Sequence, residues 1–188
     1  METTQKKEYS IFGIAANLAM ACLVSGIIIA AVYFFTSPIA VQKSIILKNN
    51  SMKALVKDAD EFKPIDGKTE WFEAKVKGKT VAYIVPSETK GYGGKIKLLV
   101  AVSPENKVIG YDVVSHNETP GLGDGITKDS FKSKLAGKIL DNLKVVKDPS
   151  NKDDIQAITG ATISSRAVVN GIKNAVEEVA ALKGGNSK

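Results

Sequence analysis

The sequence contains few of the side chains that usually build enzyme and metal centres. Among its 188 residues there is one cysteine, Cys22, and one histidine, His116. A single cysteine excludes a disulfide within the chain and an iron–sulfur cluster held by this chain's own cysteines. No spacing of histidine, cysteine and carboxylate residues resembles a transition-metal site, and no serine–histidine–carboxylate order would activate a nucleophile. We therefore expect no resident metal and no stand-alone hydrolytic chemistry.

Motifs for nucleotides and nucleic acids are also missing. No Gly-x-Gly-x-x-Gly follows a predicted strand, and no phosphate-binding loop ends in Lys-Ser/Thr, so we expect no direct nicotinamide site. The formal net charge is +6. The lysines are scattered, however, without the arginine and aromatic residues that accompany nucleic-acid binding. We expect no nucleic-acid partner, and a lysine-rich surface that tolerates the anionic headgroups of membrane lipid.

One long apolar run stands near the N-terminus. No charged residue occurs between Ile11 and Phe35. A helix of about 25 residues rises about 37 Å, which is enough to cross a hydrocarbon core. A cleavable signal peptide has a much shorter apolar core. The sequence therefore predicts a single transmembrane helix over residues 11–36, preceded by a short N-terminus of residues 1–10.

The orientation of this helix does not follow from charge. Lys6 and Lys7 precede the run, whereas Lys43, Lys48 and Lys53 follow it. Because lysines flank both ends, the positive-inside rule favours neither side.

The rest of the chain predicts an α+β domain. Alternating apolar residues predict strands over residues 71–76 and 80–85. Two further strands are predicted over 95–102 and 108–115, joined by a turn at 104–107. Further elements are a helix over residues 127–135, a short strand over 143–146 and a final helix that begins within 159–165. Hairpins with interspersed helices are typical of an antiparallel sheet with flanking helices.

Three other segments complete the expected organisation. Pro38 is expected to close the membrane segment, and residues 37–70 form a helical connector that ends in a loop over 58–70. The domain itself covers residues 71–183. Residues 184–188 form a flexible tail.

The start of the final helix carries the strongest functional signal. Ile158-Thr159-Gly160-Ala161-Thr162-Ile163-Ser164-Ser165 combines small residues with four hydroxyl groups. The free N–H groups and positive dipole at the first turn of a helix favour a phosphate. An ordinary serine or threonine cap on a C-terminal helix is the alternative interpretation.

A resemblance to a known family rests on three stretches of sequence. Thr159–Ser164 resembles the (S/T)GATx(S/T) motif of covalent flavin-binding domains. Gly91-Tyr92-Gly93-Gly94 and the His116–Gly123 stretch, which resembles that family's ETPGLG loop, precede it in the expected order. Over residues 71–183 the chain is similar to the G subunits of Rnf electron-transport complexes, and less so to the C subunits of sodium-pumping NADH:quinone oxidoreductases.

The resemblance implies a function and a cofactor. It implies that a dedicated flavin transferase esterifies FMN, through its phosphate, to Thr162. It further implies a subunit that relays electrons beside other membrane subunits of a ferredoxin:NAD oxidoreductase coupled to Na⁺ or H⁺ transport, with its domain on the extracytoplasmic side of the cell membrane. The implied cofactor-binding residues are Thr162, Thr159, Gly160, Ala161, Ser164, Ser165, Glu118, Thr119, Leu122, Gly123, Gly91, Tyr92 and Gly93.

Several interpretations stay open at this point. Where family members often have an acidic residue before the motif, this chain has Gln156, with Asp154 as a nearby substitute. The glycines near residues 91 and 121 either let the backbone approach a flat ring or simply form turns. Two other functions compete: a membrane-tethered, cofactor-free binding or scaffolding module, and an FMN subunit of a different membrane reductase.

Overall fold

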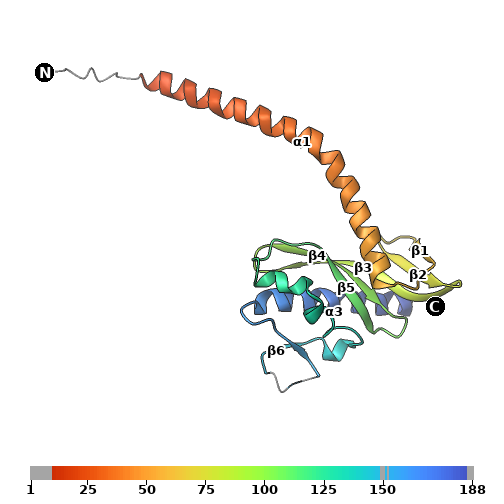
Figure 1. Cartoon of the computed structure of the whole chain (residues 1–188). Coiled ribbons are helices and arrows are strands. Elements are labelled where there is room, and N and C mark those ends of the chain that lie inside the picture. The colour runs from red at the N-terminus through yellow and green to blue at the C-terminus, as the bar shows by residue number, and fades with distance from the viewer. Residues whose placement is uncertain (1–9, 149–150, 152, 186–188) are drawn as a thin grey trace. The chain divides into compact units, whose positions relative to one another are not determined.

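The computed structural model describes residues 10–148, 151 and 153–185, and the chain divides after Ile46 into two compact units. The predicted N-terminal segment lies outside these residues except for Ser10. The helix α1 (Ile11–Leu55) begins in the first unit, and its last residues belong to the second (Figure 1).

The first unit consists of an apolar helix. Residues Ile11–Ser37 have a mean hydropathy of 2.5, and none of the most apolar stretch is buried within the protein. By length and composition this segment can cross a membrane, which confirms the predicted apolar helix. The helix continues past Pro38, where the sequence predicted the end of the membrane segment, and on to Leu55, so the connector that was predicted to be helical belongs to the same helix.

A five-stranded antiparallel sheet forms the centre of the second unit, with its strands in sequence order. The strands are β1 (Glu61–Pro64), β2 (Phe72–Val76), β3 (Lys79–Lys90), β4 (Lys95–Val102) and β5 (Val108–Ser115). The longest ladder joins β3 to β4, from Tyr83 opposite Val102 to Lys90 opposite Lys95. It therefore presents residues 91–94 as a turn at one end of the sheet.

Four details of the predicted secondary structure were wrong. The loop predicted over 58–70 contains β1, where Pro64 is tolerated because β1 is an edge strand. The short helix predicted over 127–135 is shorter still, because α2 covers only Asp129–Lys132, and the 3-10 turn η1 (Gly123–Thr127) precedes it. The strand β6 (Val145–Val146) is shorter than predicted, and it pairs in parallel with the unpredicted β7 (Ile155–Gln156). Two-residue strands are too short to show a period.

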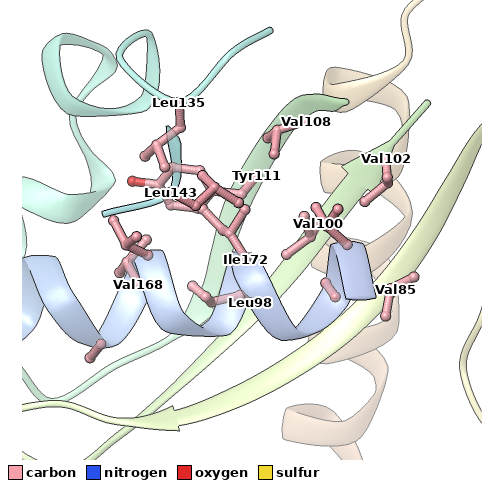
Figure 2. Close-up of a cluster of buried hydrophobic side chains, with 14 of the residues drawn as sticks. Val85, Leu98, Val100, Val102, Val108, Tyr111, Leu135, Leu143, Val168 and Ile172 are labelled. Carbon is pink, nitrogen blue, oxygen red and sulfur yellow. The ribbon is translucent and has the colours of Figure 1, made fainter. Parts of the chain in front are cut away.

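The final helix is confirmed and covers one face of the sheet. The helix α3 covers Thr162–Gly185, so it includes two residues of the predicted tail. Earlier in the chain, a short turn, η2 (Leu140–Asn142), precedes β6. Val168, Ile172, Val176 and Val179 of α3 are all at most 1% exposed. They recur at three- and four-residue steps and pack on sheet residues such as Leu98 (Figure 2).

The other face of the sheet is covered by the end of α1. Met52 and Val56 are 4% and 9% exposed and pack on a second apolar cluster of the sheet. The sheet residues of this cluster include Ala74, Ala82 and Ala101, whose small side chains let the helix lie close. Fully burying one side chain such as Met52 contributes about 2 kcal/mol. Residues 47–56 are thus part of the domain rather than a connector to it.

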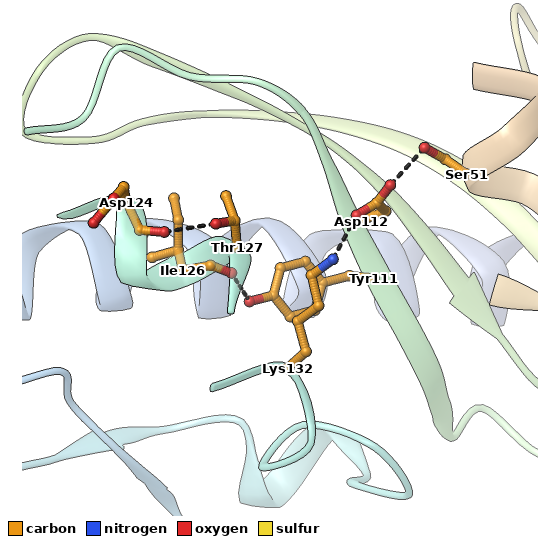
Figure 3. A network of polar contacts seen from close by, with 7 residues as sticks. All are labelled: Ser51, Tyr111, Asp112, Asp124, Ile126, Thr127 and Lys132. Carbon is orange, nitrogen blue, oxygen red and sulfur yellow. Dashed lines mark hydrogen bonds and ion pairs between the residues drawn. The ribbon is translucent and has the colours of Figure 1, made fainter. Parts of the chain in front are cut away.

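A polar network joins α1 to β5, α2 and η1 within the second unit (Figure 3). The Asp112 carboxylate accepts a hydrogen bond from Ser51 Oγ at 2.5 Å and an ion-paired one from Lys132 Nζ at 2.6 Å. Its neighbour Tyr111 points to the opposite face, where its hydroxyl donates to the carbonyl of Ile126 at 2.5 Å. Burial raises the pKa of Tyr111, so this hydroxyl remains a donor at any physiological pH.

We expect Asp112→Asn to destabilise the domain. Burial raises the pKa of Asp112, but the hydrogen bonds from Lys132 and Ser51 outweigh it and hold the pKa below its ordinary value. The stabilisation from these hydrogen bonds is therefore present at pH values above the pKa of the carboxyl in the unfolded chain, about 4. It is lost as the pH falls through the lower pKa of Asp112 in the folded protein. Losing bonds to a partly buried charge should lower the free energy of unfolding by about 1–2 kcal/mol at pH 7.

Denaturant unfolding of the full chain in detergent measures this effect. The difference between Asp112→Asn and the unchanged protein should shrink as the pH falls below about 4. Asp141→Asn, which changes an exposed carboxylate, is the control. An equal loss of stability in both variants, or a loss independent of pH, would contradict the role of the Asp112 network.

Candidate functional site

The turn that leads into α3 is held by local hydrogen bonds. Gly160 has a φ of 78°, a conformation that favours glycine, and the Ala161 N–H donates to the Ile158 carbonyl at 2.9 Å. The Ser165 hydroxyl accepts from the Ile158 N–H at 3.0 Å and donates to the Ala161 carbonyl at 2.9 Å. Because α3 begins at Thr162, the residue in the N-cap position is Ala161, which has no hydroxyl. Thr162 is therefore not the cap of this helix.

The four hydroxyl groups of this segment have different partners. Ser165 is used within the turn, and Ser164 donates to the carboxylate of Glu118. Within residues 10–148, 151 and 153–185, the structure gives no hydrogen bond to the side chain of Thr162 or Thr159. These two threonine hydroxyls are the ones left open to a ligand.

Glu118 connects all three stretches that the sequence singled out. One carboxylate oxygen, Oε1, accepts from the Gly93 N–H at 3.0 Å, and the other, Oε2, accepts from the Ser164 hydroxyl. The Glu118 N–H donates to His116 Nδ1 at 3.2 Å. The residue is 5% exposed. Its side chain thus joins the β3–β4 turn, the 116–123 loop and the first turn of α3.

The glycines of the two loops make room for Glu118. A Cβ atom on Gly91 would overlap Glu118 Oε1, and one on Gly123 would lie 2.7 Å from Oε2 and 2.9 Å from Ser164 Oγ. A Cβ on Gly93 would overlap the carbonyl oxygen of Asn117. All of these approaches are closer than atoms tolerate. The sequence attributed these glycines to a flat ligand or to plain turns, whereas the structure attributes them to packing within the protein.

These segments surround a cavity of about 760 Å³. Its lining residues are Tyr92, Glu118, Thr119, Leu122, Gly123, Lys147, Gly160, Ala161, Thr162, Ile163 and Ser164. Tyr92, Leu122 and Ile163 are 72%, 48% and 54% exposed, and all three line this one cavity. They come from three different segments and give the cavity an apolar wall.

Two lining residues were missed by the sequence analysis. Ile163 was quoted within the motif but assigned no role. Lys147 directly follows β6, and the parallel pairing of β6 with β7 brings it to the cavity. Neither a period nor a motif marks Lys147 in the sequence, because its place depends on that pairing.

Four of the predicted site residues do not line this cavity. Gly91 and Gly93 lie behind Glu118, and the Ser165 side chain is buried in its turn. Thr159 lines a neighbouring cavity of about 360 Å³ together with Gln156 and two lysines.

The residues upstream of the motif form their own loop. The Asp154 carboxylate accepts from Asn151 Nδ2 at 3.0 Å, and the Asp154 N–H donates back to Asn151 Oδ1 at 3.1 Å. Asp154 and Gln156 both line a further cavity of about 370 Å³. Asp154 is therefore adjacent to Gln156 but outside the cavity that contains Thr162.

Comparisons with known proteins agree on one family. The FMN-binding domain family matches residues 91–177. The chain is 55% identical, over 96% of its length and 97% of the relative, to the G subunit of the proton-translocating ferredoxin:NAD(+) oxidoreductase complex of Clostridium ljungdahlii. It is 37% identical to the G subunit of the Na(+)-translocating ferredoxin:NAD(+) oxidoreductase complex of Acetobacterium woodii, over 57% of this chain and 54% of that relative.

A solved structure shares the fold. NqrC of Shewanella oneidensis superimposes with a TM-score of 0.50 at 23% identity, over 67% of this chain and 73% of that one. The identity over nearly the full length of the Clostridium ljungdahlii protein decides the assignment. The chain belongs to the family of G subunits of ion-translocating ferredoxin:NAD(+) oxidoreductase complexes.

Proposed function

We propose that this chain is the membrane-anchored flavoprotein subunit of such a complex and relays electrons through FMN held covalently at Thr162. One observation supports the site above all others. The Thr162 hydroxyl has no hydrogen-bond partner in the described part of the chain, and it lies at the wall of a cavity of about 760 Å³. Cofactor sites commonly have volumes of about 300–1,000 Å³.

The residues around the cavity fit the parts of FMN. The first turn of α3 offers backbone N–H groups to a phosphate, and Lys147 adds a positive charge. Tyr92, Leu122 and Ile163 offer an apolar surface to a flat aromatic ring. Bound flavin supplies reversible electron transfer, while the protein sets its potential through burial and hydrogen bonds.

Attachment requires an activating partner. The hydroxyl of threonine is a weak nucleophile without an adjacent base, and the cavity lining contains no histidine. We infer that a separate flavin transferase removes the Thr162 proton, so that Oγ1 bonds to the FMN phosphorus of a flavin phosphoanhydride donor. The bond from that phosphorus to the anhydride oxygen breaks, and the other phosphate half of the donor leaves with the proton. In this step the chain itself contributes only the acceptor oxygen and its position. Asp154 and Gln156 lie outside this cavity, so their contribution would be to recognition by the transferase.

The membrane segment determines where the electrons pass. Residues Ile11–Ser37 would anchor the chain beside other membrane subunits and the lipid, and the domain would lie on the extracytoplasmic side. Coupling to H⁺ or Na⁺ is named for the two relatives and would belong to the assembled complex. A covalent bond would prevent loss of the cofactor from that exposed side.

We expect Thr162→Val to abolish flavin attachment. Valine keeps the shape of threonine but lacks the oxygen that would form the ester. Intact mass of the full chain, coexpressed with a flavin transferase, should show the FMN increment in the unchanged protein and none in the variant. Thr159→Ala is the matched control, because Thr159 lines the other cavity, and it should keep the increment. An FMN increment in Thr162→Val would assign attachment to another residue.

We also expect the domain to be accessible from outside the cell. Protease added to intact spheroplasts should digest residues 47–185 and leave a membrane-embedded fragment that contains residues 11–37. Inverted vesicles are the control and should protect the domain. Digestion in inverted vesicles with protection in spheroplasts would reverse the proposed orientation.

A further inference from the structure

The Glu118 carboxylate faces the protein as well as the cavity. Both of its oxygens accept hydrogen bonds from the chain, one from the Gly93 N–H and one from the Ser164 hydroxyl. Hydrogen bonds to a carboxylate are among the strong ones in proteins. Gly91 and Gly123 have no side chain where that carboxylate lies. A residue that only contacted a ligand would not need this enclosure by its own chain.

The partner Ser164 stands two residues after Thr162 on α3. A helix turns about 100° per residue, so side chains two positions apart point in different directions. Fixing Ser164 therefore fixes the rotation of the first turn about its axis, and with it the direction of the Thr162 side chain. The hydroxyl of Ser165 cannot do this, because it bonds within its own turn, to Ile158 and Ala161.

We propose that Glu118 is a positioning residue that orients Thr162 by holding Ser164 against the β3–β4 turn. The cofactor at Thr162 rests on the function proposed above. The orientation of the first turn of α3 does not, because every contact that carries it lies within the chain.

Two variants and their combination test the contact between Glu118 and Ser164. Glu118→Gln keeps the size of the side chain but removes a carboxylate oxygen, and Ser164→Ala removes the hydroxyl donor. Each should slow flavin attachment to Thr162 about tenfold, measured by intact mass against time with purified full-length chain, flavin donor and transferase. The double variant should be slowed by the same factor of about ten, because both changes remove the same interaction, the hydrogen bond from the Ser164 hydroxyl to a charged carboxylate oxygen.

Ser87→Ala is the matched control. The Ser87 hydroxyl donates to the Gly171 carbonyl of α3 at 2.9 Å, so the variant also removes a serine bond to this helix, but two turns beyond the cavity. It should leave the rate of attachment unchanged. Equal slowing by Ser87→Ala and Ser164→Ala would overturn the proposal, because general weakening of α3 would then explain both. A double variant slowed about a hundredfold would also overturn it, because the two residues would act independently.

Amide hydrogen exchange gives a readout that needs no flavin. In the full chain without cofactor, the amides of residues 165 and 166 should exchange faster in Glu118→Gln than in the unchanged protein, because Ser165 N–H is the first in α3 that bonds to a carbonyl, that of Ala161. The amides of residues 172–179 should not exchange faster. Unchanged exchange at the first turn would overturn the positioning role. A wild-type chain that accepts no flavin would refute the proposed function. The exchange result would still decide whether Glu118 positions the first turn of α3.

Discussion

The packing of α3 on the sheet is the interaction on which the rest of the structure depends. The side chains of Val168, Ile172, Val176 and Val179 in this helix are almost fully buried against β3, β4 and β5. Because these positions repeat with the helical period, they fix the axis of α3 and the place where it begins. The helix begins beside the β3–β4 turn and the 116–123 loop, which would otherwise be unrelated segments. The cavity around Thr162 is a consequence of that packing.

The buried carboxylate of Glu118 then fixes how these neighbouring segments are arranged. Glu118 bonds to a residue 25 positions before it and to another 46 positions after it. Burying a carboxylate is costly unless its oxygens are hydrogen-bonded, so these bonds must form together. The same requirement explains why glycine occupies positions 91 and 123, where any side chain would displace Glu118 or its partner. The Gly91–Gly94, His116–Gly123 and Thr159–Ser164 motifs therefore meet at the Glu118 side chain.

The end of α1 packs on the other face of the sheet in the same domain. Met52 and Val56 fill the face of the sheet opposite α3, and Ser51 bonds to Asp112 at the edge strand. The helix that contains the apolar membrane segment therefore ends inside the core of the domain. Lys132 bonds to the same carboxylate from α2, which closely follows η1 and the 116–123 loop. The Asp112 carboxylate thus links the edge strand β5 to two helices, α1 and α2.

The sequence by itself determined the elements whose residues repeat with a strong period. The apolar run over residues 11–35 has no charged residue, β2 alternates apolar and charged residues, and α3 has apolar residues every three to four positions, so local patterns sufficed to predict each of them. Three motifs in the correct order also indicated the family, because glycine and hydroxyl residues at fixed spacings are visible without a structure.

Only the tertiary structure decided which of the residues singled out by the sequence line the same cavity. Thr162 and Thr159 stand three residues apart in one motif, and the turn at Gly160 places them at different cavities. Lys147 has no local signal, since the pairing of two-residue strands brings it to the site. The edge strand β1 was hidden by its proline, and the reason for the glycines was hidden because Glu118 is distant in sequence. Contacts between residues far apart in the chain depend on how the elements pack, and no local pattern records that packing.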